Sequence, residues 1–269
     1  MSPQLTILYG GHSDIGLVRK ENQDTYGAFP EEDNHPERQR GSLFLIADGM
    51  GGHRGGGDAS RLAVQVIRDS FLKSPGAPLP ELLRTSVQLA NEAIYRESHH
   101  MFLPGIMGST CTALAIADES ACIAHVGDSR AYRISRSAIQ QLTEDHSVVG
   151  EMQRRGLLGK EGARLHPERS QITRALGAKP EVKVDIIEGI ALGESEMFLL
   201  CTDGLSNAIS DAEIQDLVVS HQAQDACKAL VDLAVSRGGE DNVTALVVHV
   251  QRSAPLGGRL HGLLHPGGS

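Results

Sequence analysis

Four aspartates stand beside apolar segments at points where the chain must turn. Three come directly after a run typical of a buried strand and the fourth comes just before one: Asp48 in LFLIADGMGGH, Asp128 in AHVGDSR, Asp203 in FLLCTDGL and Asp241 in GGEDNVT. An antiparallel course of the strands can bring all four positions to one edge of the sheets. The fold must then hold several carboxylates together, where their mutual repulsion is costly without a cation.

Each of these aspartates alone is most simply explained as a turn residue, because aspartate and glycine are common where a strand ends. The four together favour a site for a pair of hard divalent cations, which bind carboxylate oxygens. The chain has neither a cysteine cluster nor paired histidines at the spacing of a metal site. Oxygen ligation therefore predicts Mg²⁺ or Mn²⁺ and not Zn²⁺.

The apolar pattern predicts an α/β (α+β) sandwich of two mainly antiparallel sheets, flanked by pairs of antiparallel helices. Strands are expected over 43–47, 110–117, 122–126, 197–202 and 243–250, with a hairpin turn at 118–120. Helices are expected around 59–67 and 82–94, from Ser210 with Glu213 as its capping box, and over 224–237. Residues 31–40 are expected to form an exposed loop, and the Gly- and Pro-rich residues 251–269 a flexible tail.

The composition excludes two classes of partner. Over 269 residues the formal net charge is -9, and aromatic residues make up 3% with no tryptophan. Nucleic acids and anionic membranes are bound mainly through Lys and Arg, and single strands also stack on aromatic rings, so neither is expected. A phosphorylated substrate would need positive charge from a metal or from a well-placed arginine.

The cysteines and the N-terminus predict a cytoplasmic protein. Cys111, Cys122, Cys201 and Cys227 lie far apart in apolar surroundings, which favours buried, reduced thiols. The N-terminus lacks a basic segment followed by an apolar core, and no run approaches the roughly 18 apolar residues that span a bilayer.

One arginine is a candidate for binding phosphate. Arg19 lies in VRKENQD, ahead of the first of the four aspartates. An arginine beside two metal ions can bind two phosphate oxygens at once, a geometry that lysine does not reproduce. Taken alone, the same segment also fits a solvated, charged turn.

Together these segments resemble the metal-dependent protein phosphatases of type 2C, especially their compact bacterial members. The matching segments, in the order of that family, are VRKENQD, LFLIADGMGGHRGG, GSTCTAL, AHVGDSRAYRI, LTEDHS, HPERSQITRALG, FLLCTDGLSN and GGEDNVTALVV. The resemblance covers roughly residues 10–250 and implies one phosphatase domain over 1–250. It further implies a monomer that hydrolyses phosphoserine and phosphothreonine in proteins, including a Ser/Thr kinase and its substrates.

The resemblance also implies roles for individual residues. Asp48 would bridge two metal ions, the carbonyl oxygen of Gly49 would complete one site, and Asp203 and Asp241 would hold the other ion. Arg19 would bind the substrate phosphate. Such a pair of ions can direct a hydroxide at phosphorus in line with the leaving oxygen, without a covalent phosphoenzyme.

A weaker third ion is implied at Asp128, shared with Asp203 and with Ser170. Ser170 ends the segment Ser147–Ser170, which we interpret as a flap that helps to choose substrates and refer to below as the flap. Asp24 is a candidate for the outer layer of the site.

The sequence departs from the family pattern at two positions. Met50 stands where many eukaryotic relatives have a histidine proposed as general acid, so the leaving group must be protonated by another group. Gln23 stands where the family often has glutamate. His53, His146 and His166 fall in or near the matching segments, and we expect structural or flap roles for them.

Two other functions compete with the phosphatase. A regulatory module that binds phosphoproteins without turnover would not need Arg19 together with Asp48, Asp203 and Asp241, all of which are present. A nuclease with two metal ions would need a basic surface, which an acidic chain does not obviously supply.

Overall fold

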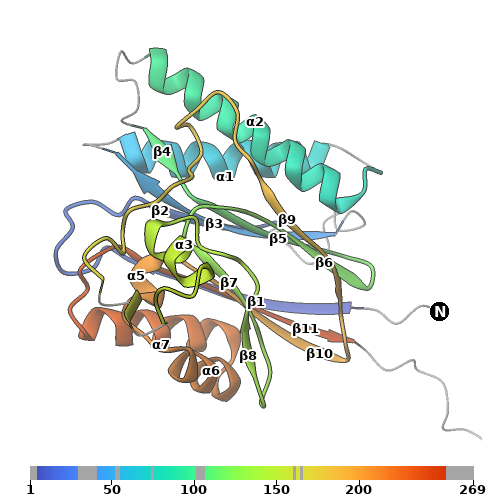
Figure 1. Ribbon diagram of the computed structural model, residues 1–269. Coiled ribbons are helices and arrows are strands. Elements are labelled where there is room, and N and C mark those ends of the chain that lie inside the picture. The colour runs from blue at the N-terminus through green and yellow to red at the C-terminus, as the bar shows by residue number, and fades with distance from the viewer. Residues whose placement is uncertain are drawn as a thin grey trace, which may run out of the picture.

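The structure is a computed structural model, and it describes residues 5–29, 41–51, 55–73, 76–100, 107–159, 162–163 and 166–252. Two antiparallel sheets are stacked face to face, with helices on both outer faces (Figure 1). This arrangement confirms the predicted sandwich. No helix in the described part of the chain combines the length and apolarity needed to cross a membrane.

The first sheet has five strands. In spatial order they are β1 (Leu5–Asp14), β11 (Val243–Arg252), β10 (Ser195–Cys201), β7 (Arg130–Ile134) and β8 (Ile139–Gln141). The chain's first and last strands are therefore neighbours, with Leu5 opposite Arg252 and Asp14 opposite Val243. This pairing brings the loop after β1 next to the segment that leads into β11.

The second sheet has the order β2 (Asp24–Phe29), β3 (Ser42–Met50), β5 (Cys111–Ala117), β6 (Ser120–Val126) and β9 (Asp185–Ala191). The short β4 (Gly108–Ser109) pairs with the end of β3. The predicted hairpin joins β5 to β6, and Asp118 at its turn has a positive φ of 51°. Aspartate tolerates this conformation better than most residues do.

Alternation along β3 explains how one strand serves two cores. Phe44 and Ile46 pack between the sheets, against residues such as Phe198 and Leu246. The alternate residues, such as Leu45, face the helices instead. A strand buried on both faces reads as a continuous apolar run, which is why this strand was visible in the sequence.

Helices cover the two outer faces. The antiparallel pair α1 (Gly55–Lys73) and α2 (Leu79–His100) lies on the second sheet, and α6 (Asp211–Ser220) and α7 (Ala223–Ser236) lie on the first (Figure 1). Ser210 accepts a hydrogen bond from the Glu213 amide while Glu213 accepts one from the Ser210 amide, so the predicted capping box is present. Two short helices, α3 (Val148–Arg154) and α5 (Asp203–Ser206), lie near the open edge of the sandwich.

The structure corrects the predicted end of the folded domain. Strand β11 continues through Gln251 and Arg252, which were assigned to the tail, because both pair with β1 and the Arg252 amide donates to the Glu194 carbonyl. The expected loop 31–40 and residues 253–269 lie outside the described residues. Sequence analysis also missed β1, β2, β4, β7, β8 and β9.

Candidate active site

The predicted site residues line one pocket of about 540 Å³ at the edge where both sheets end. They arrive from the loop after β1, the end of β3, the turn between β6 and β7, the end of the flap, the start of α5 and the residue pair before β11. The members predicted from the sequence are Arg19, Asp48, Gly49, Asp128, Ser170, Asp203 and Asp241. Met50 lines the same pocket.

Asp48 lies near the end of β3 and is held through its backbone. Its amide donates to Thr110 Oγ1 at 2.9 Å, and its carbonyl accepts from the Thr110 amide at 2.8 Å. Burial raises the pKa of its carboxyl well above the ordinary value, and the nearby charges of Asp24 and Asp203 raise it further. An ionised Asp48 is therefore unfavourable until positive charge enters the pocket.

The residue after Asp48 must be glycine for steric reasons. A Cβ atom on Gly49 would lie 2.0 Å from the Gly56 carbonyl oxygen and 2.7 Å from that of Gln23. The Gly49 amide also donates to the Gln23 carbonyl at 3.1 Å. Three backbone segments thus pack closely at this corner of the pocket, which accounts for the Asp-Gly pair on physical grounds.

Asp203 is the first residue of α5, directly after β10. Its carboxylate accepts a hydrogen bond from Asn207 Nδ2 at 3.2 Å. Burial, followed by the charge of Asp241, raises its pKa to about 6. As with Asp48, the ionised form of this carboxyl is unfavourable without positive charge nearby.

Asp24 lies behind Asp48, with which it pairs across β2 and β3. Its Oδ2 atom accepts hydrogen bonds from Thr202 Oγ1 at 2.9 Å and Thr244 Oγ1 at 2.6 Å. Its Oδ1 atom is buried and has no partner. Burial is the main reason that its pKa rises to about 7. An unpartnered acceptor here fits a place in the outer layer of a hydrated cation site.

Asp128 occupies the tight turn between β6 and β7 and is 6% exposed. Burial and the charge of Asp203 raise its pKa well above the ordinary value. The neighbouring Ser129 is joined through its hydroxyl to Thr110 Oγ1 at 2.8 Å, so the turn is connected to the backbone support of Asp48.

Arg19 and Asp241 form an ion pair, with 2.6 Å between Nη2 and Oδ2. The loop that carries Arg19 is held by Asn242, whose side chain donates to the carbonyls of Ile15 and Glu21 and accepts from the Gln23 amide. Sequence analysis missed this role of Asn242. The available signal was its place directly after Asp241.

The pocket fits divalent cations on its own chemistry. Its donors are carboxylate and carbonyl oxygens, which suit hard ions, and four buried or partly buried carboxylates have raised pKa values in their absence. Among the described residues, no three His, Cys, Asp or Glu side chains are close enough together to hold an ion by themselves.

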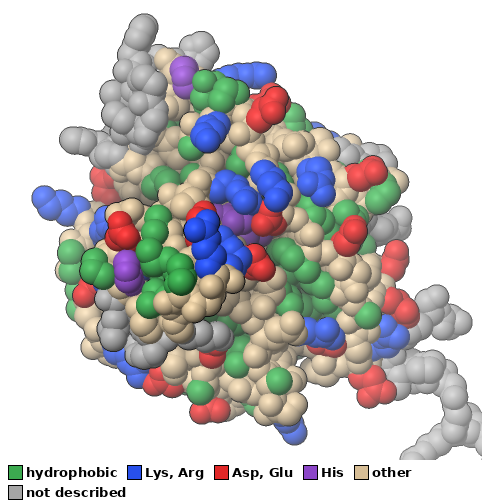
Figure 2. All heavy atoms as spheres, viewed as in Figure 1, with side chains coloured by type: hydrophobic (Ala, Val, Ile, Leu, Met, Phe, Trp, Pro, Cys, Tyr) green, Lys and Arg blue, Asp and Glu red, His purple; other side chains and the backbone are tan. Residues whose placement is uncertain are grey.

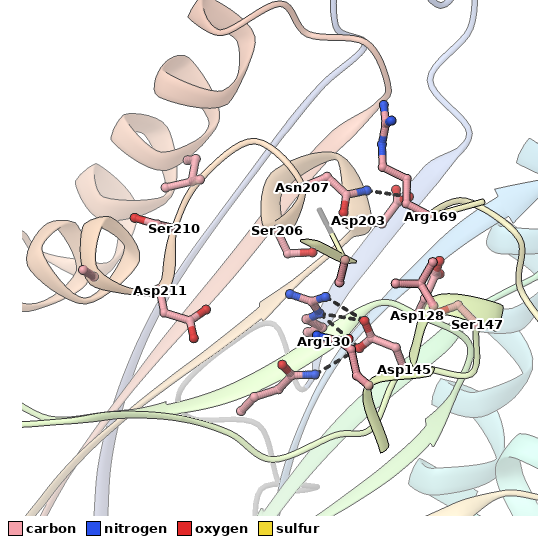
Figure 3. Close-up of a pocket in the computed structure, with 16 residues that line it drawn as sticks. Asp128, Arg130, Asp145, Ser147, Arg169, Asp203, Ser206, Asn207, Ser210 and Asp211 are labelled. Carbon is pink, nitrogen blue, oxygen red and sulfur yellow. Dashed lines mark hydrogen bonds and ion pairs between the residues drawn. The ribbon is translucent and has the colours of Figure 1, made fainter. Parts of the chain in front are cut away.

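A second pocket of about 290 Å³ adjoins the first and shares Asp128 and Asp203 with it (Figure 3). Between them and the start of α6 lies Arg130, which donates from Nε and Nη2 to Asp145 at 2.7–3.0 Å. Arg169 borders the same pocket from the end of the flap and pairs with Glu240 at 2.7 Å. Thus the acidic pocket has arginines at its border, each already paired with a carboxylate.

Basic side chains also gather near the middle of the face in Figure 2, although the chain as a whole is negative, with a net charge of -9. Phosphorylated substrates can therefore meet local positive charge on an acidic protein.

The remaining sequence candidates have structural surroundings. The four cysteines are buried and free, as expected. His166 accepts a hydrogen bond from the Glu168 amide at 3.2 Å. His146 is 3% exposed and lies in a hydrogen-bonded cluster described below. His53 falls outside the described residues.

The fold and the pocket define a phosphatase with an oxygen-lined cation site, and comparison with known proteins agrees. Residues 10–243 match the family model for protein phosphatase 2C. The chain belongs to this family and is a metal-dependent serine/threonine protein phosphatase.

The chain is similar to several bacterial serine/threonine phosphatases along most of its length. It is 38% identical over 243 residues to the serine/threonine phosphatase stp of Listeria welshimeri, covering 88% of this chain and 93% of that protein. The crystal structure of the Mycobacterium tuberculosis serine/threonine phosphatase PstP/Ppp superposes with a TM-score of 0.80 at 33% identity, over 90% of this chain and 97% of that one. A structure of the PstP catalytic domain in complex with two manganese ions gives 0.79 at 31% identity, over 92% and 100%.

Proposed function

We propose that Asp48, Gly49, Asp203 and Asp241 hold two Mn²⁺ or Mg²⁺ ions, with Asp48 shared between them, and that Arg19 binds the substrate phosphate. One observation carries this assignment: all five residues line a single pocket, in which burial raises the pKa of the Asp48 and Asp203 carboxyls. The manganese complex of the related PstP domain supports the choice of metal.

When bound, two such ions supply a hydroxide that attacks phosphorus in line with the leaving oxygen. The protein's own residues position the water and the substrate phosphate for this chemistry. Asp24 Oδ1, which has no partner in the protein, would accept a hydrogen bond from a water beside Asp48. Arg19 offsets charge on the phosphate oxygens, which is most useful in a loose phosphoryl-transfer transition state. Met50 carries no proton to donate, so the leaving group takes its proton from another group.

Asp128, together with Asp203 and Ser170, is proposed to hold a third ion more weakly. Two features support this: Asp128 and Asp203 line both adjoining pockets, and each raises the pKa of a carboxyl in its neighbourhood through its charge. Ser170 lines the catalytic pocket from the end of the flap.

The substrates are phosphoproteins, and we propose that they include a Ser/Thr kinase and its targets. We further propose that residues 1–252 act as one monomeric domain in the cytoplasm, where four unpaired thiols remain reduced.

The test is hydrolysis of a phosphothreonine peptide and of p-nitrophenyl phosphate with added Mn²⁺, Mg²⁺ or excess chelator. We expect turnover with either ion and none with chelator. The matched variants are Asp241→Asn, which should be inactive, and Asp232→Asn, which changes an exposed aspartate of α7 and should behave as wild type. Full turnover in excess chelator would contradict the proposed ligands. Phosphopeptide binding without hydrolysis under any metal condition would favour the regulatory module.

A further inference from the structure

His146 joins the turn that carries Asp128 to the base of the flap. Its amide donates to the Gly127 carbonyl at 2.7 Å, and the Gly127 amide donates back to His146 Nδ1 at 3.0 Å. Gly127 has a φ of 114°, and a Cβ atom there would lie 2.6 Å from Thr110 Cβ. The position of Asp128, the next residue, thus depends on a backbone conformation that suits glycine alone, and His146 bonds this glycine twice.

The two ends of the flap meet at the same histidine. The carbonyl of His146 accepts from the Thr173 amide at 2.7 Å. One residue further along, Ser147 forms an isolated bridge with Ile172, and the Val148 amide donates to the Gln171 carbonyl at 2.9 Å. The described ends of the flap are therefore joined at a neck that begins at His146.

The hydrogen bonds of the ring define its tautomer. Because Nδ1 accepts from the Gly127 amide, the proton of a neutral ring must be on Nε2. Nε2 lies 2.9 Å from Asp185 Oδ2, to which it donates in this tautomer, and 2.8 Å from Arg174 Nη1. Arg174 Nη1 donates to the other oxygen, Asp185 Oδ1, at 2.8 Å. Asp185 in β9 thus connects the histidine with Arg174, directly after the neck of the flap.

A second buried histidine holds the ring in this orientation. The His125 ring stacks on that of His146 with 4.7 Å between centroids. Its own nitrogens are engaged by Thr112 Oγ1 at 2.9 Å and by the Glu144 carbonyl at 3.1 Å. A ring packed in this way cannot turn over, so Nδ1 stays on the side of Gly127 and Nε2 on the side of Asp185 and Arg174.

We propose that His146 is a positioning residue for the phosphatase reaction: Nδ1 holds the Asp128 turn, and Nε2, through Asp185, holds Arg174 and the neck of the flap. His146 thereby fixes the position of the Asp128 turn relative to the neck of the flap. The part that concerns turnover rests on the role proposed for Asp128.

Two isosteric variants separate the two tasks. In His146→Asn, the side-chain oxygen can take the place of Nδ1 and accept from Gly127, while the bond to Asp185 is lost. In His146→Gln, the amide nitrogen can reach Asp185, while the acceptor for Gly127 is lost. His249→Gln is the matched control, since His249 is a partly buried histidine of β11 that belongs to neither task.

Amide hydrogen exchange on the metal-free proteins tests directly whether His146 holds the Gly127 turn and the neck of the flap. We expect exchange at Gly127 to be faster in His146→Gln by about fivefold or more, the effect of one lost hydrogen bond, and unchanged in His146→Asn. Exchange at Thr173 should be faster in His146→Asn. With Mn²⁺, the Gln variant should lose kcat for a phosphopeptide. The Asn variant should raise the phosphopeptide KM and leave p-nitrophenyl phosphate hydrolysis unchanged.

If His146 only stabilises the fold, the two variants should show a different pattern of stability and kinetics. Both variants would then lower Tm alike, with kcat and KM per folded molecule unchanged, and that result would overturn the proposal. Nitrogen NMR of the wild-type ring gives a test without any variant: a proton on Nδ1 would contradict the assigned bonds. Wild-type kinetics for Asp128→Ala would instead count against the proposed third ion, so the two failures can be distinguished.

Discussion

Nη2 of Arg19 lies 2.6 Å from Oδ2 of Asp241, so the residue proposed to bind phosphate is paired with a residue proposed to bind a cation. The Arg19 side chain is 55% exposed and that of Asp241 31%, so both can change partner without unfolding the pocket. A cation that draws the Asp241 carboxylate away would release the guanidinium toward an incoming phosphate. With the roles proposed for Arg19 and Asp241, this pair would link cation binding to substrate binding.

The first prediction concerns Arg19. Arg19→Ala should raise the KM for a phosphopeptide about tenfold or more, consistent with ~1.5–3 kcal/mol for a charge-assisted hydrogen bond, with a smaller effect on kcat. Tm should change little, because an exposed ion pair contributes little stability. Steady-state kinetics and thermal melts measure the two effects. An unchanged KM would return Arg19 to the solvated-turn interpretation, and Arg19→Lys should recover only part of the loss.

The second prediction concerns the core ligands. Asp203→Asn and Asp241→Asn should each lower kcat by several orders of magnitude, because losing one carboxylate disrupts an ion that generates the nucleophile. Circular dichroism should show an intact fold. Asparagine also removes charge repulsion in the pocket, so the Asp203 variant should be at least as stable as wild type without metal. A folded variant with near wild-type kcat would remove that residue from the ligand set.

The third prediction separates a ligand from a turn residue at Asp128. If it holds a third ion, Asp128→Ala should keep the fold and the two core ions, lower phosphopeptide turnover and shift the dependence of activity on Mn²⁺ concentration. If it serves only the turn, Tm should fall while activity per folded molecule stays near wild type. Calorimetric counting of bound ions on the folded variant, paired with kcat, decides between them. Unchanged stoichiometry at millimolar Mn²⁺ with unchanged kcat would exclude the third ion.

The fourth prediction concerns pH. Without metal, the folded-state pKa of Asp24 is about 7 and that of Asp203 about 6, above the unfolded value of roughly 3.9. Between these values the folded protein binds more protons than the unfolded chain, so these carboxylates destabilise it increasingly as pH rises to about 7. Bound cations replace those protons. The rise in Tm on adding Mn²⁺ should therefore grow from about pH 5.5 to about pH 8.

The difference between melts with and without Mn²⁺ is the useful measurement for this test. The buried His125, whose pKa burial lowers to about 4, favours stability at higher pH in both forms, and its effect largely cancels in that difference. A metal-induced rise in Tm that shrinks as pH increases would contradict the proposed ligands.

The fifth prediction concerns the thiols. Burial raises the pKa of Cys111, Cys201 and Cys227 to about 12 and that of Cys122 to about 11, so hardly any reactive thiolate exists near neutral pH. A small alkylating agent should leave activity unchanged over the time of an assay. Rapid inactivation with the fold intact by circular dichroism would show that a thiol takes part in the reaction.

Several features of this protein follow from the sequence alone. Strand β3 was predictable because burial on both faces makes every residue from Leu43 to Ala47 apolar. The hairpin was predictable from its short polar turn, and α6 from the capping box at Ser210. The pocket residues were found because aspartates at strand ends remain visible as local patterns, and resemblance to a family supplied their roles.

Other features depend on contacts between distant parts of the chain. Strand β1 contains two adjacent glycines, Gly10 and Gly11, and lacks a strand-like pattern; it forms because β11 supplies its hydrogen bonds from more than 200 residues away. The supporting roles of Asn242 and His146 are likewise invisible locally, since their partners come from separate loops and strands. Local residue patterns thus determined which groups carry the chemistry. Only tertiary packing decided which backbone segments hold those groups, because such hydrogen bonds exist only once the sheets have assembled.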